Sequence, residues 1–151
     1  MSERHSPTVA EALREGAESL RAAGVAEPRR EAGLLLAHLT GRDRTFLLTH
    51  PEERLAPARF NEFRRGVARR AAGEPLQYVT GRQDFYGLEF EVTPDVLIPR
   101  PETELLVEAA LELLKGTPAP RVCDVGTGSG CIAVALLHAR PDARATALDI
   151  S

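Results

Sequence analysis

A chain of 151 residues, 43% of them hydrophobic, is long enough to bury a core of ordinary size, as one domain or as one small domain with part of another. Its 19 basic and 22 acidic residues give a net charge of −3, which provides no reason to expect general attraction to nucleic acid or to a membrane surface. No apolar run approaches the roughly 20 residues of a membrane-spanning helix, and the polar N-terminus lacks a signal-peptide core, so we expect a cytoplasmic protein. We also expect a monomer.

Residues 1–75 predict a small bundle of helices. Thr8 and Glu11 have the spacing of a capping box, in which each side chain binds a free backbone N–H group at the start of a helix. Pro28 suits the first turn of a second helix, and Pro57 opens a third that is expected to run to about residue 72. Helices separated by such short loops are typical of a bundle.

The third predicted helix combines an apolar stripe with many arginines. Phe60, Phe63 and Val67 recur at helical spacing and are expected to face inward. The arginines between Arg59 and Arg70 then lie largely outside. A solvated helix face is the favoured interpretation of this run, and a partner-binding patch is the alternative.

Residues 76–100 predict a β-hairpin linker. Apolar residues and glutamates alternate over residues 88–92, as they do in a half-buried strand. The apolar run 96–98 is expected to resume the strand as far as Pro99. The hairpin therefore separates the helical part from a third part of the chain.

Residues 101–151 predict the opening of a parallel α/β sheet. A helix is expected from Glu102 to Lys115, a short buried strand over 121–125, a helix over 132–138 and a second strand over 145–150. The apolar side of the first of these helices is expected to comprise Leu105, Leu106, Ala109, Ala110 and Leu113. This order is β-α-β after a leading helix.

The two cysteines lie in apolar surroundings of the sequence. Cys123 and Cys131 are therefore predicted to be small buried residues in a reducing compartment, without a disulfide or a metal ion. The four histidines are scattered and lack the spacing of metal ligands, so we expect no metal site.

A glycine-rich loop joins the first predicted strand of this sheet to its helix. Asp124 precedes the loop, whose residues are Gly126, Thr127, Gly128, Ser129 and Gly130. Glycines permit a tight turn and let a ligand approach the backbone. The helix that follows offers free N–H groups and a partial positive charge, which suit a carboxylate or a phosphate. A glycine turn without a ligand is the less favoured alternative. Ordering three alternating glycines costs conformational entropy, and without a ligand the sequence gives no reason for that cost.

The identity of that ligand depends on the residues around the loop. A dinucleotide fingerprint counted from Gly126 and Gly128 places its third glycine at Cys131, which fits imperfectly. The arrangement with Asp124 resembles instead the first motif of class I methyltransferases, whose loop wraps the methionine part of S-adenosylmethionine. Asp149 follows Gly130 by nineteen residues and can accept hydrogen bonds from both ribose hydroxyls, a feature that nicotinamide enzymes share.

Three further stretches resemble the release factor glutamine methyltransferases. They are Gly-Glu-Pro-Leu-Gln-Tyr-Val-Thr-Gly at 73–81, Phe-Tyr-Gly at 85–87 and Leu-Ile-Pro-Arg-Pro-Glu-Thr-Glu at 97–104. That family has a helical N-terminal domain, a hairpin linker and a class I methyltransferase domain in this order. The resemblance implies an α/β fold in which 1–75 recognise the substrate, 76–100 form the linker and 101–151 begin a Rossmann-like cofactor domain.

The resemblance also implies the reaction and its participants. A methyl group passes from S-adenosylmethionine to the side-chain amide nitrogen of the glutamine in a Gly-Gly-Gln motif of a peptide chain release factor, without direct nucleic-acid binding. The cofactor is expected to contact Asp124, the loop 126–130 and Asp149, with Thr103 at its methionine end. Capping of the following helix is the equally favoured interpretation of Thr103. Arg100 is interpreted as a contact of the pocket or as a structural pin.

The family's catalytic Asn-Pro-Pro-Tyr motif does not occur in this sequence, so no catalytic residue is assigned. We expect a fragment that holds the start of a seven-stranded sheet and that alone neither methylates nor binds the cofactor tightly. Two alternatives stay open. One is a class I methyltransferase that acts on another protein or nucleic-acid amine, and the other is a non-catalytic partner-docking fragment.

Overall fold

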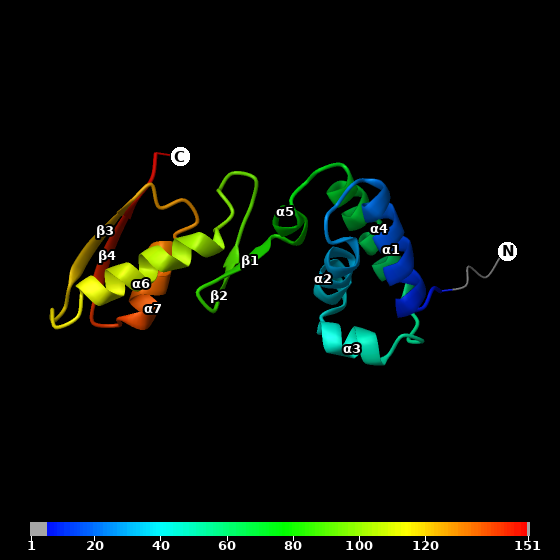
Figure 1. Cartoon of the computed structure of the whole chain (residues 1–151), viewed down its shortest axis with the longest axis horizontal. Coiled ribbons are helices and arrows are strands. Elements are labelled where there is room, and N and C mark those ends of the chain that lie inside the picture. The colour runs from blue at the N-terminus through cyan, green and yellow to red at the C-terminus, as the bar shows by residue number, and fades with distance from the viewer. Residues whose placement is uncertain (1–5, 151) are drawn as a thin grey trace. The chain divides into compact units, whose positions relative to one another are not determined.

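The computed structural model describes residues 6–150, and its contacts divide the chain into two compact units. The helical unit extends to Thr80, and the α/β unit begins at Gly81 (Figure 1). The chain thus combines helices with two small sheets. Among the described residues, no helix is long and apolar enough to cross a membrane.

Short connections join the helices of the helical unit, which are α1 (Val9–Ala22), α2 (Pro28–Thr40), α3 (Arg44–Thr49), α4 (Pro57–Ala71) and α5 (Leu76–Thr80). The Thr8 backbone N–H donates to the Glu11 carboxylate at 2.8 Å, and the Glu11 N–H donates to the Thr8 hydroxyl at 3.2 Å, which confirms the capping box. Pro28 and Pro57 stand in the first turns of α2 and α4, as predicted. Gly41 ends α2 with a left-handed φ of 66°.

The core of the helical unit lies where α1, α2 and α4 pack together (Figure 1). Phe63 of α4 is 1% exposed and Val67 is buried, which confirms two positions of the predicted stripe, whereas Phe60 is half-buried. A Cβ atom added to Gly16 of α1 would lie 2.6 Å from Cζ of Phe63. The absence of a side chain at Gly16 therefore lets α1 approach the aromatic ring.

The segment after α4 is helical where the sequence predicted the start of a β-structure. Leu76–Thr80 forms α5, because the carbonyl of Pro75 accepts hydrogen bonds from the N–H groups of Tyr78 (3.0 Å) and Val79 (3.1 Å). The hydroxyl of Thr80 adds a bond to the carbonyl of Leu76 at 3.1 Å. Local turn formation thus overrides the β-like pattern at residues 76–80, and α5 belongs to the same compact unit as the helices before it.

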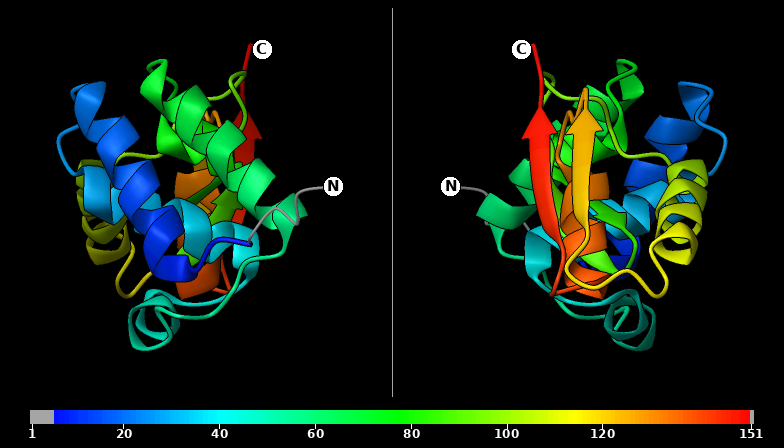
Figure 2. Two further views of the ribbon diagram at one scale, coloured as in Figure 1. Left: turned by 90° about the vertical axis from the view of Figure 1, so that its right-hand side faces the viewer. Right: turned by 90° about the vertical axis from the view of Figure 1, so that its left-hand side faces the viewer.

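The α/β unit begins with an antiparallel hairpin and continues into a parallel pair of strands. Its elements are β1 (Arg82–Phe85), β2 (Leu88–Glu91), the short 3-10 helix η1 (Pro101–Thr103), α6 (Glu104–Leu113), β3 (Arg121–Val125), α7 (Cys131–Ala139) and β4 (Arg144–Leu148). Strands β3 and β4 run in the same direction, with Val125 level with Leu148 (Figure 2). The β-α-β order predicted for this part of the sequence is therefore present.

The predicted strand at residues 96–98 is absent, which corrects that expectation. Val96 closes a turn by donating its N–H to the Thr93 carbonyl at 3.1 Å. Ile98 is nevertheless buried. The apolar run therefore contributes a buried side chain to packing, while the hairpin is extended by the bond from the Val92 N–H to the Gly81 carbonyl at 3.0 Å.

Burial in the α/β unit differs from the predicted pattern on one side of the sheet. The core consists of one side of α6 and α7 with the hairpin; its buried members are Phe85, Phe90, Val107, Cys131, Ala135 and Leu136. Val125 is 77% exposed and Leu113 is 84% exposed, and Leu105 and Leu106 are exposed as well. The expectation of a buried strand over 121–125 is therefore wrong at Val125, and the apolar side expected for α6 is uncovered at Leu105, Leu106 and Leu113. In this unit α6 packs through Val107 against α7, and α7 packs against the strands.

The two cysteines differ in their burial. Cys131 is buried at the start of α7, as predicted. Cys123 is exposed, which corrects the prediction, because its side chain lies on the sheet together with exposed Val125 and Thr146. Both thiols are free.

An arginine clasp holds the beginnings of β3 and β4 together. The Arg140 guanidinium donates to both carboxylate oxygens of Asp142 at 2.9 Å and to the carbonyls of Leu114 (3.0 Å) and Thr117 (2.9 Å). The N–H of Ala119 donates to the same carboxylate at 3.1 Å. Hydrogen bonding to Arg140 lowers the pKa of Asp142 from 3.8 to about 2.

We expect the effect of Asp142→Asn on stability to depend on pH. A depressed carboxyl pKa stabilises the fold fully above the unfolded value near 3.8, and this contribution is lost as pH falls through about 2. Wild type should therefore be more stable than the variant at pH 6, with a difference that shrinks between pH 4 and 2. Urea unfolding at several pH values measures this difference. A difference that stays constant over that interval would contradict the assigned role.

Candidate functional site

The glycine loop lies between the end of β3 and the start of α7. The backbone N–H groups of Gly126 and Thr127 both donate to the carbonyl of Leu148, at 2.8 and 3.0 Å, so the loop is fastened to the end of β4. Gly126, Gly128 and Gly130 have φ values of 77°, 54° and 78°. These left-handed conformations explain why the loop requires glycines.

Two carboxylates flank this loop. The hydroxyl of Thr127 donates to Oδ2 of Asp124 at 2.8 Å, which closes the turn after β3. The backbone N–H of Gly128 donates to Oδ2 of Asp149 at 2.8 Å. Asp149 therefore points toward the loop, as a residue that helps to hold a ligand there must do. The carboxyl ends of the two parallel strands thus bring the two acids to the same loop.

The start of α7 adds polar backbone groups to the same place. Gly130 is the N-cap residue. Because glycine has no side chain, no side-chain hydrogen bond caps the start of this helix. The N–H groups of a first helical turn have no partners within their helix. A Cβ atom on Gly126 or Gly128 would meet nothing within 4 Å, so the space beside the loop is open to a ligand. The arrangement offers N–H donors beside a carboxylate acceptor.

The roles of Thr103 and Ser129 as ligand contacts remain predictions. Ser129 is half-buried within the loop. Thr103 is half-buried in η1, and its N–H donates to the Arg100 carbonyl at 3.0 Å. Its side chain does not cap α6, so the alternative capping role is wrong. No group of three or more His, Cys, Asp and Glu residues suited to a metal ion occurs between residues 6 and 150.

Comparison with known proteins identifies the family. Residues 11–81 match the model described as PrmC N-terminal domain. A release factor glutamine methyltransferase of Burkholderia pseudomallei is 54% identical over 121 residues, which are 80% of this chain and 42% of that protein. A second, from Moorella thermoacetica, is 50% identical over 144 residues, which are 95% of this chain and 51% of that protein. The chain belongs to the release factor glutamine methyltransferase family.

A further relative by sequence gives a similar result. The Escherichia coli release factor glutamine methyltransferase is 44% identical over 137 residues, which are 91% of this chain and 48% of that protein. The crystal structure of a release factor-specific protein-(glutamine-N5) methyltransferase from Alicyclobacillus acidocaldarius shares 60% identity over 40% of this chain and 38% of that chain, with a TM-score of 0.32. The chain spans about half the length of the curated relatives it matches.

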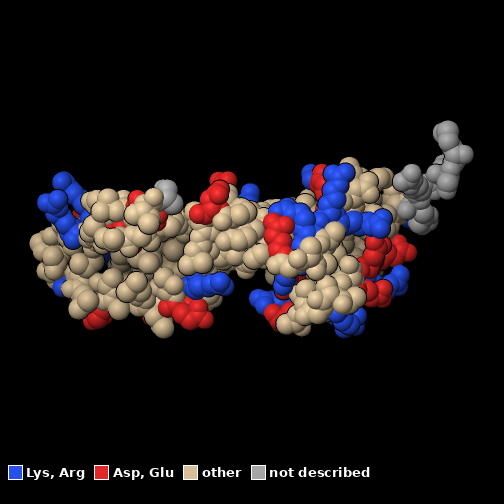
Figure 3. All heavy atoms as spheres, turned by 90° about the horizontal axis from the view of Figure 1, so that it is seen from above, with Lys and Arg blue, Asp and Glu red and all other residues tan. Residues whose placement is uncertain are grey.

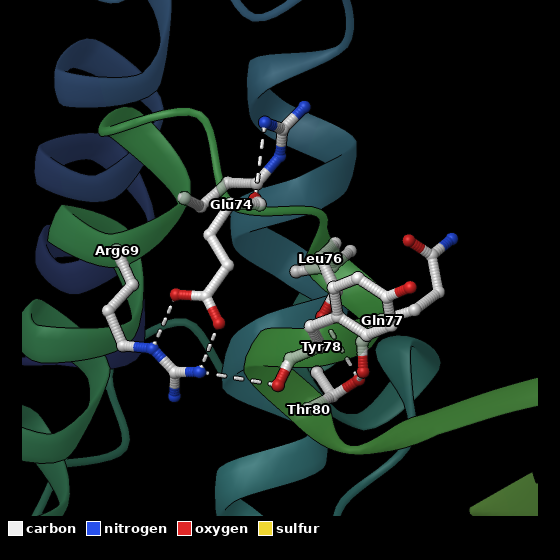
Figure 4. A network of polar contacts seen from close by, with 7 residues as sticks. Arg69, Glu74, Leu76, Gln77, Tyr78 and Thr80 are labelled. Carbon is white, nitrogen blue, oxygen red and sulfur yellow. Dashed lines mark hydrogen bonds and ion pairs between the residues drawn. The ribbon is translucent and has the colours of Figure 1, made fainter. Parts of the chain in front are cut away.

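The first of the three stretches that resemble this family forms a polar clamp at the end of α4 (Figure 4). The Arg69 guanidinium binds both carboxylate oxygens of Glu74, in one case at 2.8 Å, and also donates to the Tyr78 carbonyl at 3.3 Å. This hydrogen bonding raises the pKa of Arg69 and lowers that of Glu74. Beside it, the Arg70 guanidinium binds Glu31 of α2 at 2.5 Å. The clamp fixes α5 against α4. The charges of Arg69, Arg70 and Glu74 therefore have a structural role.

One contact of the third stretch was missed by sequence reasoning. The carboxylate of Glu104 accepts a hydrogen bond of 2.8 Å from the backbone N–H of Tyr86. Tyr86 has a left-handed φ of 52°, and Gly87 follows with 73°, so this N–H lies at the turn of the hairpin. A glutamate in the first turn of a helix predicts charge matching of that helix, and nothing in its spacing indicates a partner eighteen residues earlier. Glu104 thus ties the hairpin to α6.

Proposed function

We propose that this chain carries the S-adenosylmethionine site and the substrate-recognition part of an enzyme that methylates release factors. The methyl group passes from the cofactor's sulfonium to the side-chain amide nitrogen of the glutamine in a Gly-Gly-Gln motif. The carbon–sulfur bond breaks as the carbon–nitrogen bond forms, and the nitrogen loses a proton. In-line positioning of the two reactants supplies much of the rate for such a poor nucleophile.

A single contact carries the proposal for the cofactor, namely the Asp149 carboxylate against the Gly128 backbone at 2.8 Å. A ribose bound over the loop can donate its hydroxyls to that carboxylate, and the methionine carboxylate can receive N–H groups at the start of α7. Cys131 supports S-adenosylmethionine over a dinucleotide. It is buried where the dinucleotide fingerprint needs glycine or alanine for close helix–strand packing.

Roles for the other parts of the chain follow from this assignment. Residues 1–75 recognise the release factor, and residues 76–100 link this part to the cofactor domain. Residues 101–151 begin a Rossmann-like sheet. The cofactor is contacted by Asp124, the loop 126–130, Asp149 and Thr103. We assign no catalytic residue within this chain. The cytoplasm is the proposed compartment, since free thiols suit a reducing environment.

A chimaera tests the proposed reaction. Residues 1–151 replace the matching residues of the Escherichia coli relative, and the product is incubated with S-adenosylmethionine that carries a labelled methyl group. We expect label in a release factor and none in the same factor with its Gly-Gly-Gln glutamine changed to alanine. Circular dichroism verifies that the chimaera is folded. Label that enters RNA, or that enters the alanine variant equally, would contradict the proposed substrate, as would a folded chimaera that transfers nothing.

A further inference from the structure

A pocket of the helical unit is lined by three arginines from three separate segments. Arg42 follows α2, Arg54 lies between α3 and α4, and Arg59 belongs to the first turn of α4. Glu53 is the sole acid among the described residues that line this pocket. We call it the arginine pocket. It lies outside the glycine loop, and its function does not depend on methyl transfer.

The floor of the arginine pocket is apolar and firmly held. Val9, Leu47 and Leu55 line it and are all buried. The Val9 N–H donates to the Glu53 carbonyl at 2.8 Å, and the Leu55 N–H donates to the Pro7 carbonyl at 2.9 Å. These bonds fasten the segment before α1 to the loop before α4. The pocket is therefore formed before any ligand arrives, which lowers the entropy cost of binding.

Three arginines and one glutamate line the arginine pocket, so the charge of its lining is positive. Figure 3 shows Lys and Arg interleaved with Asp and Glu over the face of this unit that it presents. Pairs such as Arg64 with Glu15 at 3.0 Å neutralise one another. In the pocket, Arg59 has a partner, Glu62, at 2.9 Å, but both side chains of this pair are about half exposed. An exposed pair of this kind is worth at most about 1 kcal/mol, so a ligand carboxylate can replace Glu62.

The aromatic residue of the pocket argues against a nucleic acid as the ligand. The Arg42 guanidinium lies 4.6 Å from the centroid of the Phe46 ring, and the His50 ring stacks on Phe46 at 4.1 Å. Little ring surface is left for a base to stack on, although stacking supplies much of the affinity for single strands. An apolar floor is equally unsuited to a sugar–phosphate backbone. It suits an apolar side chain flanked by carboxylates.

We propose that the arginine pocket binds an acidic segment of a partner protein. One apolar side chain of that segment lies on Val9, Leu47 and Leu55, and flanking carboxylates pair with Arg42 and Arg59. Arg54 contributes charge while its guanidinium also holds the Ser6 carbonyl at 2.8 Å. Guanidinium groups favour carboxylates because they can donate two parallel hydrogen bonds.

Fluorescence anisotropy with a labelled Glu-Leu-Glu-Glu-Leu-Glu peptide tests this proposal on the whole chain. We expect binding that weakens on the order of tenfold in the double variant Arg42→Glu, Arg59→Glu, and that weakens with added salt. Arg54 is left unchanged because of its bond to Ser6. Circular dichroism of each variant verifies that the helices are intact, and Arg42→Gln with Arg59→Gln provides a milder pair if charge reversal unfolds the chain.

A matched control removes the same charge from other helix surfaces. In Arg14→Glu, Arg29→Glu both changes lie on exposed positions outside the pocket, on α1 and α2. We expect less than about a twofold change in its peptide affinity. Equal weakening in both double variants would overturn the proposal, since it would indicate general charge attraction. So would the absence of peptide binding, or tighter binding of an oligouridine than of the acidic peptide.

Discussion

Phe63→Ala is expected to lower the free energy of unfolding of the helical unit by about 3–5 kcal/mol. The ring is among the largest fully buried side chains of the chain and belongs to the core in which α1, α2 and α4 pack. Its removal leaves a cavity that the surrounding helices fill only partly. Urea denaturation followed by helical circular dichroism measures the loss. A decrease below about 1 kcal/mol would show that this ring is not central to the core.

The close approach of Gly16 to this ring provides a second, coupled test. We expect Gly16→Ala to destabilise the unit by about 1–3 kcal/mol, because the added Cβ would lie 2.6 Å from Cζ of a ring that is only 1% exposed. Gly33→Ala is the matched control on α2, where the nearest atom, Nε of Arg44, lies at an ordinary 3.7 Å. Alanine there should stabilise by up to about 1 kcal/mol through helix propensity. If both alanines stabilise alike, the proposed contact with Phe63 is wrong.

Local signals explain which parts of the fold could be predicted from the sequence. The capping box at Thr8 and Glu11 and the prolines at the starts of α2 and α4 act within one or two helical turns, and they predicted those helices correctly. The helix at Leu76–Thr80 could not be predicted from alternation alone. Its stability depends on Pro75 as an acceptor and on an arginine clamp that reaches back to α4.

Burial was less predictable than the order of the elements. Hydrophobic periodicity shows which residues share a face, but it does not show which face is covered. Val107 of α6 is fully buried, whereas Leu113 on the same helix is 84% exposed. The same reason accounts for Cys123, which lies on a strand whose sequence resembles a buried one.

The loop could be predicted because its constraints are backbone constraints. Gly126, Gly128 and Gly130 all have left-handed φ values, which their residue type indicated. The contact from Gly128 to Asp149 depends on two strands lying in parallel, and the β-α-β pattern predicted that pairing. The bond from Glu104 to Tyr86 had no such signal, because it depends on how the hairpin packs against α6.

Asp149→Asn is expected to weaken the binding of S-adenosylmethionine by about 10- to 100-fold, a prediction that rests on the proposed function. Asparagine can still accept the hydrogen bond from Gly128 through its amide oxygen, so the loop should keep its conformation. It loses the charge that strengthens hydrogen bonds from the ribose hydroxyls. The amide resonances of residues 126–130 in the chimaera described above, followed by NMR during a titration with S-adenosylmethionine, measure the affinity with aspartate and with asparagine at position 149.

Asp142→Asn is the matched control, because it removes the same charge at the start of β4 whereas Asp149 follows its end. Its affinity for S-adenosylmethionine at pH 7 should equal that of the wild type. Since Asp142 is engaged with Arg140 and Ala119, a loss of affinity there would indicate that the loop responds to the stability of the sheet as a whole. Unchanged affinity in Asp149→Asn would contradict the ribose contact. Saturating cofactor that leaves the 126–130 resonances unmoved would contradict the site itself, because N–H groups that receive a carboxylate must change their chemical shifts.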